Sequence, residues 1–156
     1  MTARVLLFSA WALILSLLPA GASALSAEHA LAIAAGENDS RIEALNAAVA
    51  RGDERLAVFV QAMLDDEVKV AGEKVFIVHD GKATDAATGA PAPLPEGAED
   101  VTNNNRTRGA LEAALAGLRV LSPDVGVRRG AVDELAKASL DESSLPLVEK
   151  AYAAET

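Results

Sequence analysis

The chain has 156 residues, of which 51% are hydrophobic, 3% aromatic and 24% charged, and this length suits a single domain. Its Lys and Arg residues number 14 against 23 Asp and Glu, and the net charge of −9 argues against a nucleic-acid-binding surface, because phosphate contacts need a basic patch. The absence of Cys excludes disulfides, thiolate metal sites and a cysteine nucleophile. The composition therefore predicts an acidic, helix-rich module without indicating its function.

Residues 1–24 have the three parts of a secretory signal peptide. Arg4 supplies a positive charge, residues 5–18 form an apolar run of 14, and Ala22 and Ala24 give the small-residue pattern that precedes cleavage. An uncleaved membrane anchor is the alternative, but a span needs about 20 residues. We therefore expect cleavage after Ala24 and a mature domain on the extracytoplasmic, periplasmic side of the membrane.

Three helices are expected next, at about 26–35, at about 41–50 and after Asp53. The third has the cleanest amphipathic stripe, with apolar residues at i, i+3, i+4, i+7 and i+8: Leu56, Phe59, Val60, Met63 and Leu64. The period then changes to that of strands, with a polar–apolar alternation followed by a β-branched run. A β-hairpin is expected at about 67–79.

A surface loop, neither strand nor helix, is expected at about 89–102, where three prolines lie within five residues and acidic residues follow: Pro91, Pro93, Pro95, Glu96, Glu99 and Asp100. Helices resume at about Asn103. Ser122 and Pro123 then have the N-cap and first-turn positions of a second helix, and a last one is expected from about Ser144.

Two helical pairs resemble each other along the chain. The apolar and acidic landmarks at 42–59 recur at 132–148, with offsets of 88 to 90 residues. Each block reads as a helix, a short acidic break and a second helix, which is the form of a HEAT-like repeat, and stacking such pairs buries the faces that one pair leaves open. The predicted fold is mainly α: a HEAT-like helical-repeat (α-α superhelix) domain at 25–156 with an inserted β-hairpin.

Motifs for chemistry are sparse, and we expect no enzyme, no cofactor and no metal. His79 beside Asp80 could be a metal ligand or general base, but a solvated histidine at a strand end is the favoured interpretation. The three carboxylates at 65–67 could bind Ca²⁺ weakly, yet they lack the spacing of an EF-hand loop and read better as a solvated break.

The most unusual segment runs from residue 103 to 108, with three amides and two guanidiniums just before an apolar helix. One interpretation is a polar contact patch for a protein partner or a small amide-like ligand; the other is a capped helix start whose Arg side chains brace the Pro-rich loop. The candidate partner-binding residues are Asn103, Asn104, Asn105, Arg106 and Arg108. Arg128 joins them, since it opens a helix where the dipole disfavours cations; the alternative is an exposed Arg whose stem covers apolar surface.

Several landmarks together resemble one family. They are the secretory signal, the helical pairs, the hairpin, the turns at Asp80-Gly81 and 85–89, and above all the stretch from Asn103-Asn104-Asn105-Arg106 through Ser122-Pro123-Asp124. In these features the chain is similar to the N-terminal extracytoplasmic region of the urea-type ABC transporter permease, a relative of the branched-chain amino acid permeases.

The resemblance implies an accessory or interaction domain for urea uptake across the cytoplasmic membrane, in a fragment that lacks the membrane-spanning part. It implies as partners the membrane permease domain, the other transporter subunits and the periplasmic urea-binding protein. No urea-contacting residue can be carried over, because the conducting part is missing. Two alternatives remain: a free-standing periplasmic protein-binding module of helical repeats, and, less favoured, a periplasmic enzyme.

Overall fold

The computed structural model describes residues 25–52, 54–122, 124–137 and 149. Within these ranges the helices are α1 (Ala27–Ala34), α2 (Asn38–Arg51), α3 (Glu54–Leu64), α4 (Asn105–Val120) and α5 (Val125–Lys137). The strands are β1 (Val68–Ala71), β2 (Lys74–His79), β3 (Lys82–Asp85) and β4 (Glu99–Asp100). The expected signal peptide at 1–24 and the expected helix from Ser144 lie outside the described residues.

The fold is mixed α/β, and the prediction of a mainly α, HEAT-like superhelix with one inserted hairpin is wrong. The described elements comprise five helices and one four-stranded antiparallel sheet with strand order β3-β2-β1-β4. The hairpin predicted at 67–79 is present as β1 and β2, but it is the centre of a larger sheet. β4 lies within the stretch expected at 89–102 to contain no strand, so that expectation is also wrong at residues 99–100.

The missed strands are short and carry no apolar alternation. β3 reads KATD and β4 is the dipeptide Glu99–Asp100, so neither has the β-branched pattern by which a strand is recognised. β3 forms because Asp80 and Gly81, with φ of 49° and 74°, make the tight turn that folds it back on β2. β4 forms only because it pairs with β1, whose residues lie about 30 positions earlier in the chain, in the register Val70↔Glu99 and Lys69↔Asp100.

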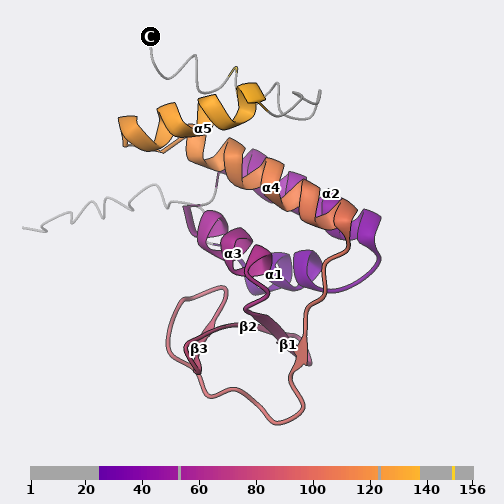
Figure 1. The fold of residues 1–156 in the computed structure, drawn as a ribbon. Coiled ribbons are helices and arrows are strands. Elements are labelled where there is room, and N and C mark those ends of the chain that lie inside the picture. Colours follow the sequence, from indigo (N-terminus) through magenta and orange to yellow (C-terminus); the bar gives the residue numbers. More distant parts are fainter. Residues whose placement is uncertain (1–24, 53, 123, 138–148, 150–156) are drawn as a thin grey trace, which may run out of the picture.

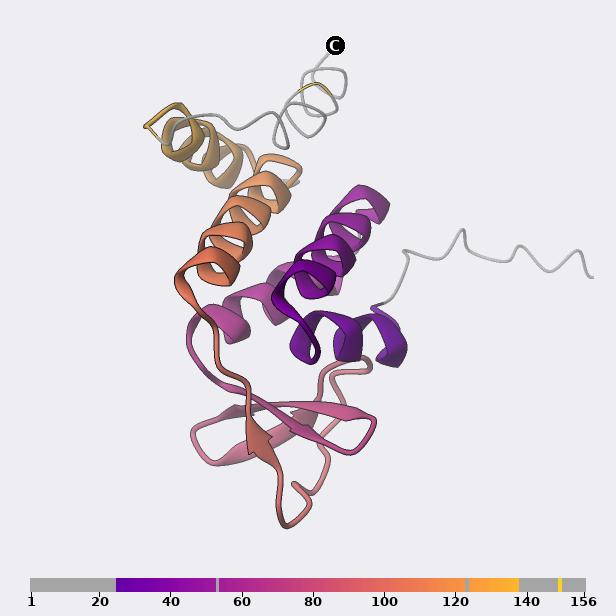
Figure 2. The ribbon, with the colours of Figure 1, turned by 90° about the vertical axis from the view of Figure 1, so that its right-hand side faces the viewer.

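The core lies between the helices and one face of the sheet. The α3 stripe provides its centre, since Leu56, Phe59 and Val60 are completely buried. Val68 and Val75 carry the core into the sheet, which α1 covers. Figures 1 and 2 show the helices gathered on one side of the sheet, with the later part of the loop between β3 and β4, residues 93–98, on the other side.

α4 organises the helical layer, because it packs against α2, α3 and α5. Its buried face includes Leu111 and Leu115. α5 adds a separate small contact, in which Ala131 packs near Val120. Within the described ranges, no helix has both the length and the apolar character needed to cross a membrane.

Candidate functional site

The segment 103–108 lies where the chain leaves β4 and enters α4. Asn104 is the N-cap residue of α4, and its Oδ1 accepts a hydrogen bond of 2.8 Å from the backbone N–H of Thr107. An Asn at this position satisfies one of the first-turn donors of the helix. The interpretation as a capped helix start is therefore confirmed for Asn104.

Asn103 is held by a buried arginine that the sequence reasoning missed. The Arg41 side chain of α2 is only 5% exposed. Its Nη2 donates to Asn103 Oδ1 at 2.7 Å, its Nη1 to Thr102 O at 3.1 Å, and its Nε to Ile33 O at 2.9 Å. One guanidinium thus ties α2 to the end of α1 and to the chain between β4 and α4.

The charged guanidinium of Arg41 is hydrogen-bonded to neutral oxygen acceptors and is not paired with a carboxylate in the described part of the chain. In the described ranges no carboxylate forms an ion pair with it, and its three recorded hydrogen bonds all go to carbonyl or amide oxygens. Burial lowers the pKa of Arg41, because desolvation penalises the charged form. The side chain still carries its proton, since arginine remains protonated in proteins.

Asn103 and Arg108 also close the end of α3. Asn103 Nδ2 donates to Met63 O at 2.8 Å, and Arg108 Nη1 donates to Leu64 O at 2.9 Å. Arg108 Nη2 in addition contacts both carboxylate oxygens of Asp66 at 3.2 Å. The last carbonyl groups of a helix lack partners within the helix, and these two side chains supply them. Asn103 and Arg108 therefore point inward.

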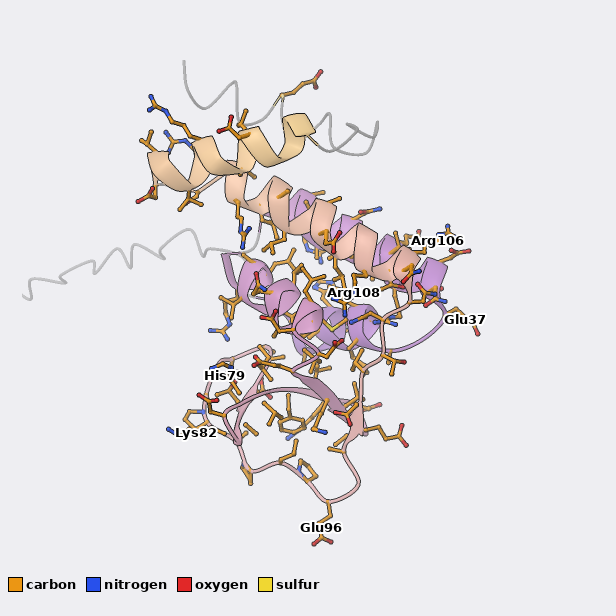
Figure 3. All side chains as sticks on the ribbon, viewed as in Figure 1. Glu37, His79, Lys82, Glu96, Arg106 and Arg108 are labelled. Carbon is orange, nitrogen blue, oxygen red and sulfur yellow. The ribbon has the colours of Figure 1, made fainter. Side chains whose placement is uncertain are left out.

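Asn105 and Arg106, in contrast, face the solvent. Figure 3 shows Arg106 at the outer end of α4 and Arg108 closer to the body of the molecule. The Arg106 side chain is 71% exposed and its Nη2 lies 2.9 Å from Oδ1 of Asp39, which is 75% exposed. Such an exposed pair contributes at most about 1 kcal/mol to stability. We call Asp39, Asn105 and Arg106 the helix-start surface.

The helix-start surface joins two helices that begin side by side. Buried Thr107, in the first turn of α4, donates from Oγ1 to Asn38 Oδ1 at 3.2 Å, and Asn38 is the first residue of α2.

Arg128 does not belong to this surface. Its Nη1 donates to Ser122 O at 3.0 Å, just beyond the far end of α4. A helix of 16 residues is about 24 Å long, so the structure separates Arg128 from Arg106 by that order of distance.

The three carboxylates at 65–67 turn in different directions. Asp65 accepts from Gln61 Nε2 at 3.1 and 3.0 Å, Asp66 pairs with Arg108, and Glu67 contacts His79. They therefore do not converge on a point where a cation could bind. Across the described part of the chain, no cluster of three His, Asp or Glu side chains is arranged to hold a metal ion.

His79 forms an exposed pair with a carboxylate at the end of β2. Its Nδ1 lies 2.5 Å from Glu67 Oε1, and its Nε2 lies 3.5 Å from Asp80 Oδ2. The pKa of His79 is raised, first by the hydrogen bond to Glu67 and then by the charges of Glu67, Asp80 and Asp65. The protonated ring ties the beginning of β1 to the end of β2.

This pair predicts a small pH dependence of folding. Because the His79 pKa is higher in the folded chain, the stabilisation is fully present below about pH 6.5, the ordinary histidine value, and is lost as the pH rises through the raised pKa. We expect His79→Gln to reduce the denaturant midpoint more at pH 6 than at pH 8.5. Equal reductions at the two pH values, measured by circular dichroism, would contradict the pairing.

Comparisons with known proteins add no relatives. No family model matches the chain, no curated protein matches it, and no solved structure matches it. The functional argument therefore depends on the residues themselves and on the resemblance described above.

Proposed function

We propose that this chain is a periplasmic interaction domain, and that it acts as an accessory domain of a urea ABC transporter permease. The resemblance of residues 103–124 to the extracytoplasmic region of that permease supports the transporter assignment. In this proposal the partners are the membrane permease domain, the other subunits and the periplasmic urea-binding protein. The helix-start surface makes the contact with the urea-binding protein.

The observation that carries the proposal is the division of the segment 103–108 into two sets of side chains. Asn103 and Arg108 are partly buried and hydrogen-bonded to neighbouring elements, whereas Asn105 and Arg106 are exposed beside them. The inward set fixes the backbone from which the outward set projects. A partner that binds Arg106 then spends little free energy on ordering the loop, which is the general advantage of a preorganised surface. Arginine is also enriched at protein interfaces.

Reversing the charge of this surface tests the proposal. We expect Arg106→Glu to weaken binding of the purified urea-binding protein at least about tenfold, a loss of about 1.4 kcal/mol, because arginine is enriched among the interface residues whose loss costs about 2 kcal/mol or more. The measurement is isothermal titration calorimetry with the full chain, after checking that the denaturant midpoint is unchanged. Arg51→Glu is the matched control, because Arg51 is an exposed arginine in the last turn of α2.

Three results would decide between the alternatives. Equal affinity for Arg106→Glu and the unaltered chain would remove the helix-start surface from the contact. No binding to any transporter subunit, with Arg106-dependent binding to another exported protein, would favour the free-standing periplasmic module. Recovery of the chain from the cytosol after cell fractionation would contradict a periplasmic interaction domain altogether.

A further inference from the structure

The Pro-rich part of the loop between β3 and β4 has a backbone that its sequence alone restricts. In residues 90–95 every second residue is proline: Pro91, Pro93 and Pro95. Proline fixes its own φ near −65°, and the residue before a proline is pushed to extended or polyproline II conformations. Ala90, Ala92 and Leu94 each precede a proline. All six residues are therefore confined to an extended, polyproline-type path, and we call residues 90–95 the proline ridge.

The structure fixes the first half of the proline ridge to the edge of the sheet. Asp85 N donates to Ala90 O at 2.9 Å, and Ala92 N donates to Ala83 O at 3.0 Å, so that Ala90 and Ala92 run beside β3. The turn before them is closed by Asp85, whose Oδ1 accepts from Thr88 N at 2.8 Å and from Ala87 N at 3.0 Å. These hydrogen bonds, with those from Thr88 first, lower the pKa of Asp85, so the carboxylate stays charged and bonded near neutral pH.

The second half of the ridge is fixed at its far end. Ala98 N donates to Pro95 O at 3.4 Å, and the chain then enters β4, which pairs with β1. Since β3 and β4 occupy opposite edges of the sheet, residues 93–98 must cross one of its faces. Figures 1 and 2 place this crossing on the face away from the helices. The ridge is thus held at both ends without entering a strand.

The ridge presents apolar surface and unused acceptors to the solvent. Pro91, Pro93, Leu94 and Pro95 are all exposed, and Leu94 is 37% exposed. The carbonyl oxygens of Pro93 and Leu94 accept no hydrogen bond from a backbone N–H of the described part of the chain. Rings and a branched side chain on an extended backbone with open carbonyl groups are the features that aromatic-lined grooves bind in proline-rich ligands.

The charge around the ridge indicates what the partner's groove carries at its rim. Glu96 and Glu99 follow directly and are both exposed. Figure 3 shows Glu96 at the tip of the loop between β3 and β4, remote from Arg106 and the helix-start surface. The described part of a second copy offers no such groove, because its aromatic side chains, Phe59 and Phe76, are 0% and 3% exposed.

We propose that the proline ridge is a docking element for a protein partner that presents a shallow groove lined by Trp or Tyr, with Lys or Arg at its rim. The ridge binds as a preformed polyproline-type ligand, with Pro93, Leu94 and Pro95 in the groove and Glu96 at the basic rim. Binding costs little conformational entropy, because prolines and the two anchored ends have already restricted the backbone. The inference names a second contact surface for the interaction domain proposed above and rests on that function.

Site-specific cross-linking in living cells tests the ridge. A benzophenone amino acid replaces Leu94 in the full chain, and after irradiation the cross-linked peptide is sequenced by mass spectrometry. We expect a cross-link to a partner peptide that contains Trp or Tyr close to Lys or Arg, lost when Pro93→Ala and Pro95→Ala are added. The same probe at Glu73, exposed in the turn between β1 and β2, is the control and is expected to give no such product.

The affinity measurement separates the docking role from folding. With the identified partner purified, we expect the Pro93→Ala, Pro95→Ala chain to bind at least about tenfold more weakly, with a denaturant midpoint lowered only by the small amount that the freer unfolded chain of a variant lacking two prolines causes. A cross-link to lipid, to a second copy of this chain or to a peptide without aromatic residues would overturn the proposal, as would equal affinity. A cross-linked partner outside the transporter would support the docking role of the ridge but contradict the proposed transporter function. Arg106-dependent binding of the urea-binding protein without any cross-link at Leu94 would support the transporter function but contradict the docking role of the ridge.

Discussion

Arg41→Met is expected to lower the free energy of unfolding by about 3–5 kcal/mol. The substitution retains much of the aliphatic stem but removes the donors to Ile33 O, Thr102 O and Asn103 Oδ1. An acceptor that stays buried without a donor costs about 1–3 kcal/mol. Chemical denaturation followed by circular dichroism gives the change directly. Arg51→Met at the exposed end of the same helix is the control, with a change within about 0.5 kcal/mol.

Two further variants show whether the effect comes from the hydrogen bonds. Arg41→Lys keeps the charge, but one ammonium group cannot reproduce the fork that reaches three separate acceptors, so a loss of about 2 kcal/mol is still expected. Combining Arg41→Met with Asn103→Ala is expected to cost less than the sum of the single losses, because both remove the same contact. A loss below about 1 kcal/mol for Arg41→Met would show that the guanidinium does not hold these elements together.

Elements with a strong local pattern were predictable from the sequence. Four of the five members of the α3 stripe, Leu56, Phe59, Val60 and Met63, are at most 1% exposed, and Leu64 is partly buried. The β1–β2 hairpin has the expected position, with turn residues at 72–73 between its strands. In both places a single element carries enough apolar periodicity to determine which side is buried.

Elements that depend on distant partners were not predictable. β4 consists of two acidic residues, and it is a strand only because β1 offers a free edge beside it. Arg41 is a similar case, since a charged residue is read as exposed unless its acceptors are known. A local signal did exist: Arg41, Leu45 and Ala48 are spaced i, i+4 and i+7 and, with Val49, form the buried face of α2.

The segment 103–108 shows why composition could not separate structural from exposed polar residues. Asn103 and Asn105 are chemically identical, yet one bridges Arg41 and Met63 and the other faces the solvent. The difference follows from their positions on either side of the Asn104 cap. The capped helix start therefore describes Asn104, whereas the contact patch stays a prediction for the exposed Asn105 and Arg106.

The proline ridge also has a structural consequence on the far face of the sheet. Phe76 lies in β2 between Val75 and Ile77, and it pairs with Lys69 on β1 and with Asp85 on β3. Val75 and Ile77 pack in the helical core, and since side chains alternate along a strand, Phe76 points to the opposite face of the sheet. Phe76 is nevertheless only 3% exposed. We infer that residues 93–98, which cross this face, cover Phe76 and give the sheet a second, smaller apolar contact beneath the loop.

Phe76→Ala is expected to lower the free energy of unfolding by about 3–4 kcal/mol, the range for removal of a buried aromatic ring with incomplete collapse of the cavity. Phe76→Leu is expected to cost less than about 1.5 kcal/mol, because it leaves most of the volume filled. Lys74→Ala, an exposed change on the same strand, is the control. The distinctive readout is hydrogen exchange: the amide of Ala92, bonded to Ala83 O, should exchange faster in Phe76→Ala, while amides within α2 follow only the global loss of stability. A stability loss without faster exchange at Ala92 would mean that the loop does not rest on this ring, and the ridge would then owe its extended path to its prolines and end contacts alone.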